Sequence, residues 1–159
     1  LEFRRVLFRS FDPVTLGHLD IIERSSRLFD RLVVVILENS DKHATFSIEE
    51  RLAFLQANTA HLPNVEAAVD HGLTVDFARH KKACAIVRGV RSVKDYEYEL
   101  DIASVNQHIA PDVETVLLYA SPKYSYVSSS IIRELVKYDQ DITAYVPGDV
   151  CAAFAQRKK

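Results

Sequence analysis

The run Leu32-Val33-Val34-Val35-Ile36-Leu37 is continuous, apolar and mostly β-branched, which is typical of a strand buried on both faces of a parallel sheet. Similar short runs recur before and after it, at residues 6–8, 65–69, 83–87 and 113–119. Segments with helical spacing separate these runs. Alternating strands and helices predict an α/β fold in a single domain, with a doubly wound parallel sheet as the middle of three layers. In such a fold, ligands bind beyond the carboxyl ends of the strands.

The helical segments differ in how clearly their ends are marked. Ser47 and Glu50 have capping-box spacing, so a helix is expected to begin just after Ser47. Residues 93–109 are expected to form the longest helix, with an apolar face that includes Tyr96, Leu100, Ala103 and Ile109. The other expected helices carry the apolar sets Leu19, Ile22 and Phe29, and Val75, Phe77 and Ala78, or span residues 129–137 and 149–156.

Composition narrows the class of protein. The 159 residues include 20 Lys and Arg against 22 Asp and Glu, and a net charge of -2 argues against a nucleic-acid partner. No apolar run approaches the roughly 20 residues that span a bilayer, and no cleavable signal pattern is present, so no membrane partner is expected. Cys84 and Cys151 match no metal-ligand spacing, which favours reduced, packed thiols and a cytoplasmic location.

The first candidate anion site follows the first strand. Ser10-Phe11-Asp12-Pro13 leads into Thr15-Leu16-Gly17-His18 and then directly into a helix. The free backbone N–H groups at a helix N-terminus favour an anion, and the His18 imidazole adds a directed N–H donor. A lone histidine is more often structural, so this interpretation depends on the surrounding motif.

Two further segments have the same character. Arg88-Gly89-Val90-Arg91 follows the fourth apolar run, and two arginines around a glycine suit bidentate phosphate contacts, although a solvated turn is the alternative. Ser128-Ser129-Ser130 precedes the helix expected over 129–137, where serines are also ordinary caps. Lys42 lies in a polar loop after the second strand, where a solvated lysine is equally plausible. All four sites are expected on one rim of the sheet, which predicts a shared anion site.

The motifs together resemble those of bacterial phosphopantetheine adenylyltransferases, within the TxGH/HxGH nucleotidyltransferases. The resemblance spans about residues 10–150 and includes Asp95-Tyr96-Glu97-Tyr98-Glu99-Leu100 and Tyr124-Ser125-Tyr126-Val127-Ser128-Ser129-Ser130. Thr15 favours this family over relatives that have histidine at that position, such as nicotinamide-mononucleotide adenylyltransferases. The resemblance implies a Rossmann-like fold and transfer of AMP from ATP to 4'-phosphopantetheine, giving dephospho-coenzyme A and pyrophosphate. It also implies Mg²⁺ and a homohexamer.

The resemblance also assigns residues. It implies catalytic roles for His18, Lys42, Arg88 and Arg91. It implies that 4'-phosphopantetheine contacts Ser10, Lys42, Thr74 and Arg88. For the ATP site it implies Ser10, Phe11, His18, Gly89, Val90, Arg91, Glu99, Tyr124, Ser125, Tyr126, Val127, Ser128, Ser129 and Ser130. No set of residues forms a dedicated metal cage, so Mg²⁺ is expected to be held mainly by phosphates and water.

The N-terminal segment departs from this pattern. The family typically has Pro-Gly where this chain has Phe8-Arg9, and the sequence contains no Met. We therefore expect residues 1–9 to be a non-native segment that supplies a first strand at about 5–8, followed by the nucleotidyltransferase domain at 10–159. Two alternatives to the assigned function remain. One is an adenylyltransferase for another phosphorylated acceptor, and the other is a nucleotide-binding protein impaired in catalysis by the altered start.

Overall fold

The computed structural model describes residues 4–38 and 43–157. Its core is a five-stranded sheet in the order β3-β2-β1-β4-β5, in which every pairing is parallel. The strands are β1 Arg4–Arg9, β2 Arg31–Leu37, β3 Val65–Asp70, β4 Ala85–Val90 and β5 Glu114–Tyr119. The doubly wound parallel sheet expected from the apolar runs is confirmed, and its order reverses between β1 and β4.

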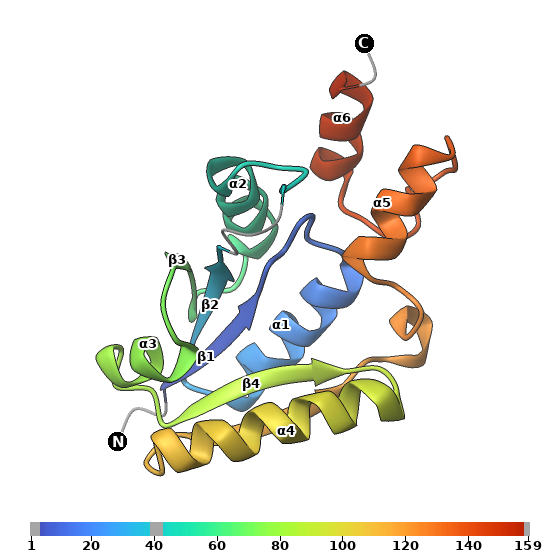
Figure 1. Cartoon of the computed structure of the whole chain (residues 1–159). Helices are drawn as coiled ribbons and strands as arrows, with labels where there is room; N and C mark the ends of the chain where they lie inside the picture. The colour runs from blue at the N-terminus through green and yellow to red at the C-terminus, as the bar shows by residue number, and fades with distance from the viewer. Residues whose placement is uncertain (1–3, 39–42, 158–159) are drawn as a thin grey trace.

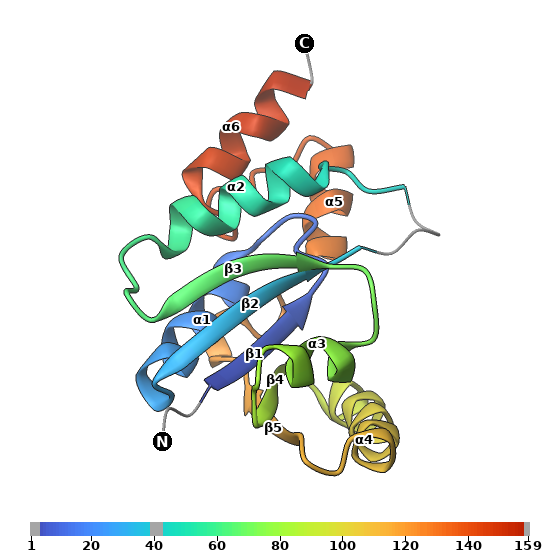
Figure 2. The same cartoon turned by 90° about the vertical axis from the view of Figure 1, so that its left-hand side faces the viewer.

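Helices cover both faces of this sheet (Figures 1 and 2). The helices are α1 Leu16–Leu28, α2 Ile48–Thr59, α3 Thr74–His80, α4 Val93–Ile109, α5 Ser129–Lys137 and α6 Gly148–Arg157, with a short 3-10 turn at Pro122–Tyr124. Alternate residues of each strand face opposite layers. Leu7 and Val34 pack in one core with α1, α2, α5 and α6, whereas Phe8 and Val35 pack in a second core with α3.

Hydroxyl side chains define where the main helices begin. Oxygens of Thr15, Ser47, Ser92 and Ser128 each accept a hydrogen bond from the backbone N–H three residues later, at the starts of α1, α2, α4 and α5. These bonds satisfy N–H groups that have no partner within the helix. Three of these helices, α1, α4 and α5, begin next to the carboxyl ends of β1 and β4, so polar groups gather at that rim.

One sequence expectation about burial was wrong, that of packed thiols, and the apolar face of the longest helix is largely exposed. The helix at 93–109 has the expected bounds, but Tyr96, Leu100 and Ile109 on its expected apolar face are exposed, and its buried residue is Glu99. Cys84 is exposed rather than packed, and Cys151 is partly buried. Burial raises the pKa of the Cys151 thiol, with a further contribution from Asp141 and Asp149.

Candidate active site

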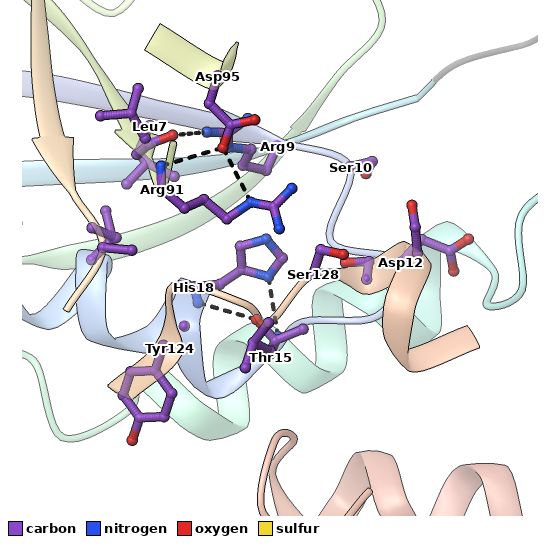
Figure 3. A pocket seen from close by; sticks show the side chains of 18 of the residues that line it. Leu7, Arg9, Ser10, Asp12, Thr15, His18, Arg91, Asp95, Tyr124 and Ser128 are labelled. Carbon is purple, nitrogen blue, oxygen red and sulfur yellow. Dashed lines mark hydrogen bonds and ion pairs between the residues drawn. The ribbon is translucent and has the colours of Figure 1, made fainter. Parts of the chain in front are cut away.

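A cavity of about 470 Å³ lies beyond the carboxyl ends of β1 and β4 (Figure 3). The three expected segments all contribute to its wall, as the shared anion site requires. They supply Ser10, Thr15, Gly17 and His18 from the β1–α1 connection, residues 89–91 from the end of β4, and residues 128–130 from the start of α5. Segments far apart in the sequence therefore converge on one cavity because they follow neighbouring strands or abut the same rim.

His18 is held by a reciprocal cap at the start of α1. Its backbone N–H donates to Thr15 Oγ1 at 3.2 Å, and its Nδ1 accepts from the Thr15 backbone N–H at 3.1 Å. Because Nδ1 is an acceptor, the neutral ring carries its proton on Nε2. Phe11 packs edge-on against the imidazole, with ring centroids 5.1 Å apart. The cap thus fixes both the tautomer and the direction of the ring.

The His18 imidazole is neutral near pH 7. Burial, with the nearby positive charges of Arg9 and Arg91, lowers its pKa to about 3. The imidazole lies between the Thr15 cap and the Arg91 guanidinium (Figure 3). His18 can therefore offer one Nε2–H donor to an anion in the cavity without itself carrying a charge.

The turn after β1 is fixed from several sides. The Asp12 carboxylate accepts backbone N–H groups of Thr45 and Phe46 at 2.8 and 2.9 Å. Arg51 of α2 donates to the Ser10 carbonyl at 2.9 Å. Phe11 has a φ of 49°, a conformation that non-glycine residues seldom adopt, and its ring is fully buried. Tertiary contacts therefore determine the path of this turn along the cavity wall.

The three serines of α5 have different roles. Ser128 is the N-cap and accepts from the Ile131 N–H at 3.2 Å, as an ordinary capping serine would. Ser129 donates to the Pro13 carbonyl at 2.7 Å, which ties α5 to the β1 turn. Ser130 accepts from Arg133 at 3.2 Å. All three line the cavity, so capping and exposure to a ligand are compatible here.

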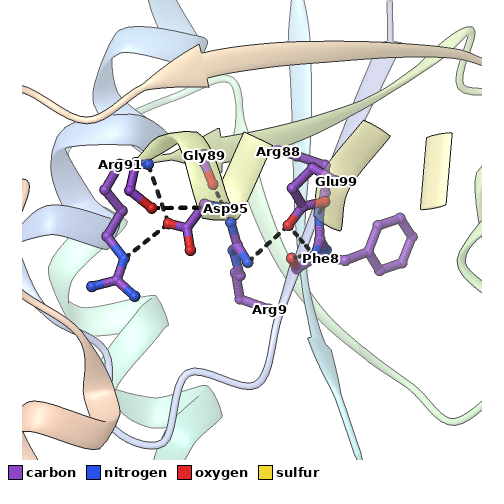
Figure 4. Close-up of polar contacts among 8 residues, drawn as sticks. Phe8, Arg9, Arg88, Gly89, Arg91, Asp95 and Glu99 are labelled. Atoms are coloured by element: carbon purple, nitrogen blue, oxygen red, sulfur yellow. Dashed lines mark hydrogen bonds and ion pairs between the residues drawn. The ribbon is translucent and has the colours of Figure 1, made fainter. Parts of the chain in front are cut away.

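At the end of β4, Arg88 is engaged by protein groups (Figure 4). Its Nε and Nη2 donate to the two Glu99 oxygens at 2.7 and 2.9 Å, and its Nη1 donates to the Phe8 carbonyl at 2.8 Å. Arg9 lies 3.3 Å from the same carboxylate and also donates to the Gly89 carbonyl. Burial and Arg88 lower the pKa of Arg9 to about 10, although Glu99 opposes that shift. Glu99, only 3 % exposed, thus balances two arginines.

The end of β4 also corrects a sequence expectation. The strand continues to Val90 instead of ending at Val87, so Arg88, Gly89 and Val90 are strand residues and not a turn. A Cβ on Gly89 would lie 3.3 Å from Ile21 Cγ1, so the glycine allows α1 to pack closely on the strand. Arg91 follows the strand, and Asp95 accepts from its backbone N–H at 3.2 Å and its Nε at 3.1 Å.

Comparison with known proteins shows which family this chain belongs to. Residues 8–135 match a family model described as cytidylyltransferase-like. The chain is 47% identical to the phosphopantetheine adenylyltransferase of Levilactobacillus brevis, covering 93% of this chain and 92% of that protein. It is 44% identical to the one from Staphylococcus carnosus, covering 98% and 97%. This chain belongs to the phosphopantetheine adenylyltransferase family.

Solved structures support the fold of this family member. A putative nicotinate-nucleotide adenylyltransferase from Vibrio parahaemolyticus matches with a TM-score of 0.72 and 16% identity, over 98% of this chain and 93% of that one. A lipopolysaccharide core biosynthesis protein from Thermoplasma volcanium matches with a TM-score of 0.57 and 24% identity, over 76% and 98%. At these identities the likeness concerns architecture alone.

The site residues that the sequence analysis expected in this chain fall into three groups. Those lining the cavity are Ser10, His18, Gly89, Val90, Arg91, Glu99, Tyr124, Val127, Ser128, Ser129 and Ser130. Those outside its wall are Phe11, which is in the core, Arg88, Thr74 at the start of α3, Ser125 and Tyr126. Lys42 lies outside the described residues.

Sequence reasoning missed two arginines on the cavity wall, Arg51 and Arg133. Arg133 lies one helical turn after Ser130, a spacing that puts both on one face of α5. That spacing was the available signal. Arg51 follows the capping box of α2 by one residue, and nothing in the sequence distinguishes it from a surface arginine.

Within residues 4–38 and 43–157, no group of three His, Cys, Asp or Glu side chains is placed to hold a metal ion. In the same ranges, no helix is both long and apolar enough to cross a bilayer.

Proposed function

We propose that this chain transfers AMP from ATP to 4'-phosphopantetheine, giving dephospho-coenzyme A and pyrophosphate, in the cytoplasm. Membership of the phosphopantetheine adenylyltransferase family supports the substrates. The observation that carries the proposal is the neutral His18 at the start of α1, in a cavity that Arg91 and Ser128 also line. A directed donor beside cations and a helix N-terminus suits a polyphosphate.

The reaction needs no general base in this cavity. The acceptor's phosphate is already an anion, and one of its oxygens attacks the α-phosphorus of ATP. The bond between that phosphorus and the bridging oxygen breaks, and the electron pair leaves with pyrophosphate. The protein positions the groups and offsets developing charge. His18 Nε2–H would donate to an α-phosphate oxygen, while Arg91 and the α5 serines would hold the outer phosphates.

The acceptor side is proposed to use Ser10, Lys42, Thr74 and Arg88. A guanidinium has five N–H donors, and three of those on Arg88 are occupied by Glu99 and the Phe8 carbonyl. The remaining two would have to meet the acceptor's phosphate from behind the cavity wall, which Arg88 does not line. Glu99 therefore acts as a positioning residue, because its buried carboxylate fixes the plane of the Arg88 guanidinium.

Mg²⁺ fits this cavity as a partner of ATP. Asp12 accepts two backbone N–H groups, Asp95 binds Arg91, and Glu99 binds two arginines. Because these carboxylates of the described wall are engaged, Mg²⁺ would be held mainly by phosphate oxygens and water. The ion would neutralise charge on the phosphates during transfer.

We further propose that the chain forms a homohexamer through α4. Tyr96, Leu100, Val105 and Ile109 on this helix are between 43% and 58% exposed, although they are apolar. Exposed apolar patches of this kind mark interaction sites. Light scattering should give six times the 18.0 kDa chain mass, and Val105→Glu should lower it. A monomeric unmodified chain would contradict this assembly.

One observation favours a second candidate, a nucleotide-binding protein without turnover. Arg9 contributes to the cavity wall where the family typically has glycine. The test supplies ATP and Mg²⁺ with either 4'-phosphopantetheine or nicotinamide mononucleotide and measures pyrophosphate release. We expect release only with 4'-phosphopantetheine. ATP binding without release would favour the second candidate, and release with nicotinamide mononucleotide would mean another acceptor.

A further inference from the structure

Helix α6 lies along α2 and contacts both of its ends (Figure 2). Near the end of α2, Asn58 Nδ2 donates to both carboxylate oxygens of Asp149, at 3.1 and 2.9 Å. In the first turn of α2, Glu50 accepts from Arg157 Nη2 at both carboxylate oxygens, at 2.8 and 2.7 Å. These two contacts fix the last turn of α6 beside the segment that leads into α2.

Arg157 also contacts this segment directly. Its Nη1 donates to the Thr45 carbonyl, and its guanidinium carbon lies 4.3 Å from the centroid of the Phe46 ring. A guanidinium over an aromatic ring is attracted to the face of that ring. The Phe46 side chain is fully buried and also packs edge-on against Phe154 of α6, with ring centroids 4.8 Å apart. Helix α6 therefore holds the peptide group between Thr45 and Phe46 from one side.

The other side of this peptide group faces the candidate active site. The Phe46 N–H donates to one oxygen of the Asp12 carboxylate at 2.9 Å, and the Thr45 N–H donates to the other at 2.8 Å. Asp12 lines the cavity and is 8% exposed. The peptide group thus accepts from Arg157 at its carbonyl and donates to Asp12 at its N–H. Hydrogen bonds in such a chain polarise and strengthen one another, so α6 is connected to the cavity wall.

The same segment borders the part of the cavity proposed for the acceptor. Residues 43 and 44, which precede Thr45, line the cavity. Ser47 follows Phe46, and its carbonyl accepts from Arg51 Nε at 3.4 Å. The Nη1 of this arginine donates to the carbonyl of Ser10, a residue proposed to contact the acceptor, at 2.9 Å. A displacement of this segment would therefore alter the acceptor side of the cavity.

We propose that Arg157 is a positioning residue for the acceptor. From α6 it holds residues 45–46 against Asp12, and this keeps the neighbouring cavity wall in the shape that binds 4'-phosphopantetheine. The inference rests on the proposed function, because it takes the acceptor to bind beside this segment. Without Arg157, the acceptor would have to order the segment as it binds, which lowers its apparent affinity. ATP should respond little, because His18 is held by its own cap at the start of α1.

The test separates the two substrates. Arg157→Met removes the donors to Thr45 and Glu50 but keeps a long side chain, and it should still fold because Arg157 is 42% exposed at the last residue of α6. The KM for 4'-phosphopantetheine should rise about fivefold, the effect of losing one hydrogen bond of ordinary strength, while kcat and the KM for ATP stay unchanged. Arg27→Met is the matched control, since it removes an arginine from an exposed ion pair on α1, and it should change none of these values.

A purely structural role of Arg157 would give a different result. Urea unfolding would then show a less stable variant whose two KM values are unchanged or rise together, and either outcome overturns the inference. Hydrogen exchange of the chain without substrates gives a second measurement. The Thr45 and Phe46 amides should exchange faster in Arg157→Met than in the unmodified chain and in Arg27→Met. Equal exchange in all three would overturn the inference.

Hydrogen exchange does not depend on turnover, so the two proposals can fail separately. If the unmodified chain forms no dephospho-coenzyme A, the proposed function fails, and the exchange of the Thr45 and Phe46 amides still decides whether Arg157 holds this segment. If the chain turns over and Arg157→Met keeps the unmodified KM for 4'-phosphopantetheine, only the inference about Arg157 fails.

Discussion

Helices α1 and α2 begin with the same device and use it differently. At α2, Ser47 accepts from the Glu50 N–H while the Glu50 carboxylate accepts from the Ser47 N–H. Thr15 and His18 repeat this arrangement at α1. Glu50 also binds Arg157 at the surface, whereas His18 still has Nε2 toward the cavity. An imidazole has two nitrogens on opposite sides, so it can close a cap with one and offer a donor with the other.

The largest expected effect is on turnover, which should differ sharply between a variant without the His18 side chain and one without the Glu50 side chain. His18→Ala should lower kcat by about 10²–10³, the effect typical of losing one donor to a developing charge, while ATP binding changes little. Glu50→Ala removes the residue at the equivalent helix position and should leave kcat close to that of the unmodified chain. Steady-state kinetics with both substrates measures this. Near-normal turnover in His18→Ala would mean that the histidine only caps the helix.

Removing either capping hydroxyl should have a smaller effect. Both variants should lose stability, but only one should lose turnover. Thr15→Ala and Ser47→Ala should each lower the free energy of unfolding by about 1 kcal/mol, since each loses one capping bond. Turnover should fall only in Thr15→Ala, and by less than in His18→Ala, because the backbone N–H of residue 15 still donates to Nδ1. Urea unfolding and kinetics on the same samples separate the two effects. Equal turnover in both variants would remove the link between this cap and catalysis.

The smallest expected effect is the contribution of Glu50 to the way folding stability depends on pH. A hydrogen bond from Arg157 and one from the Ser47 N–H hold the pKa of this carboxyl below its ordinary value. Because the folded pKa is lower than the unfolded one, the stabilisation is present above the unfolded pKa and is lost as pH falls through the folded value. The Glu50–Arg157 pair is partly exposed, so the change is small. Unfolding in urea at pH 6 and pH 3 should show a smaller loss of stability for Glu50→Gln than for the unmodified chain; equal losses would contradict this.

Much of the fold could be predicted because local patterns determine it. The apolar runs gave the parallel strands, and the Ser47–Glu50 spacing gave the start of α2. The cap at α1 was not foreseen as a reciprocal one, because its partner is His18 and not the usual Glu or Gln. The end of β4 was misplaced because Arg88 and Gly89 look like a turn, until Glu99 and Ile21 supply their tertiary partners.

Which arginines are paired could not be predicted. Arg88 was expected from the resemblance. The structure adds that both carboxylate oxygens of Glu99, eleven residues further along the chain, accept hydrogen bonds from its guanidinium. Arg51 and Arg133 have carboxylates nearby in the sequence, yet they bind carbonyls and a hydroxyl. Such pairing depends on side chains brought together by the sheet, for which sequence spacing carries no signal.

The protonation of His18 in the folded protein tests most directly whether this residue is a neutral donor. ¹⁵N NMR of the imidazole should show a protonated Nε2, an unprotonated Nδ1, and no titration between about pH 5 and 8, the range in which an unperturbed histidine changes charge. This follows from a pKa lowered to about 3 and from the bond between the Thr15 N–H and Nδ1. A protonated Nδ1, or a titration near the ordinary histidine pKa, would contradict the role assigned to His18.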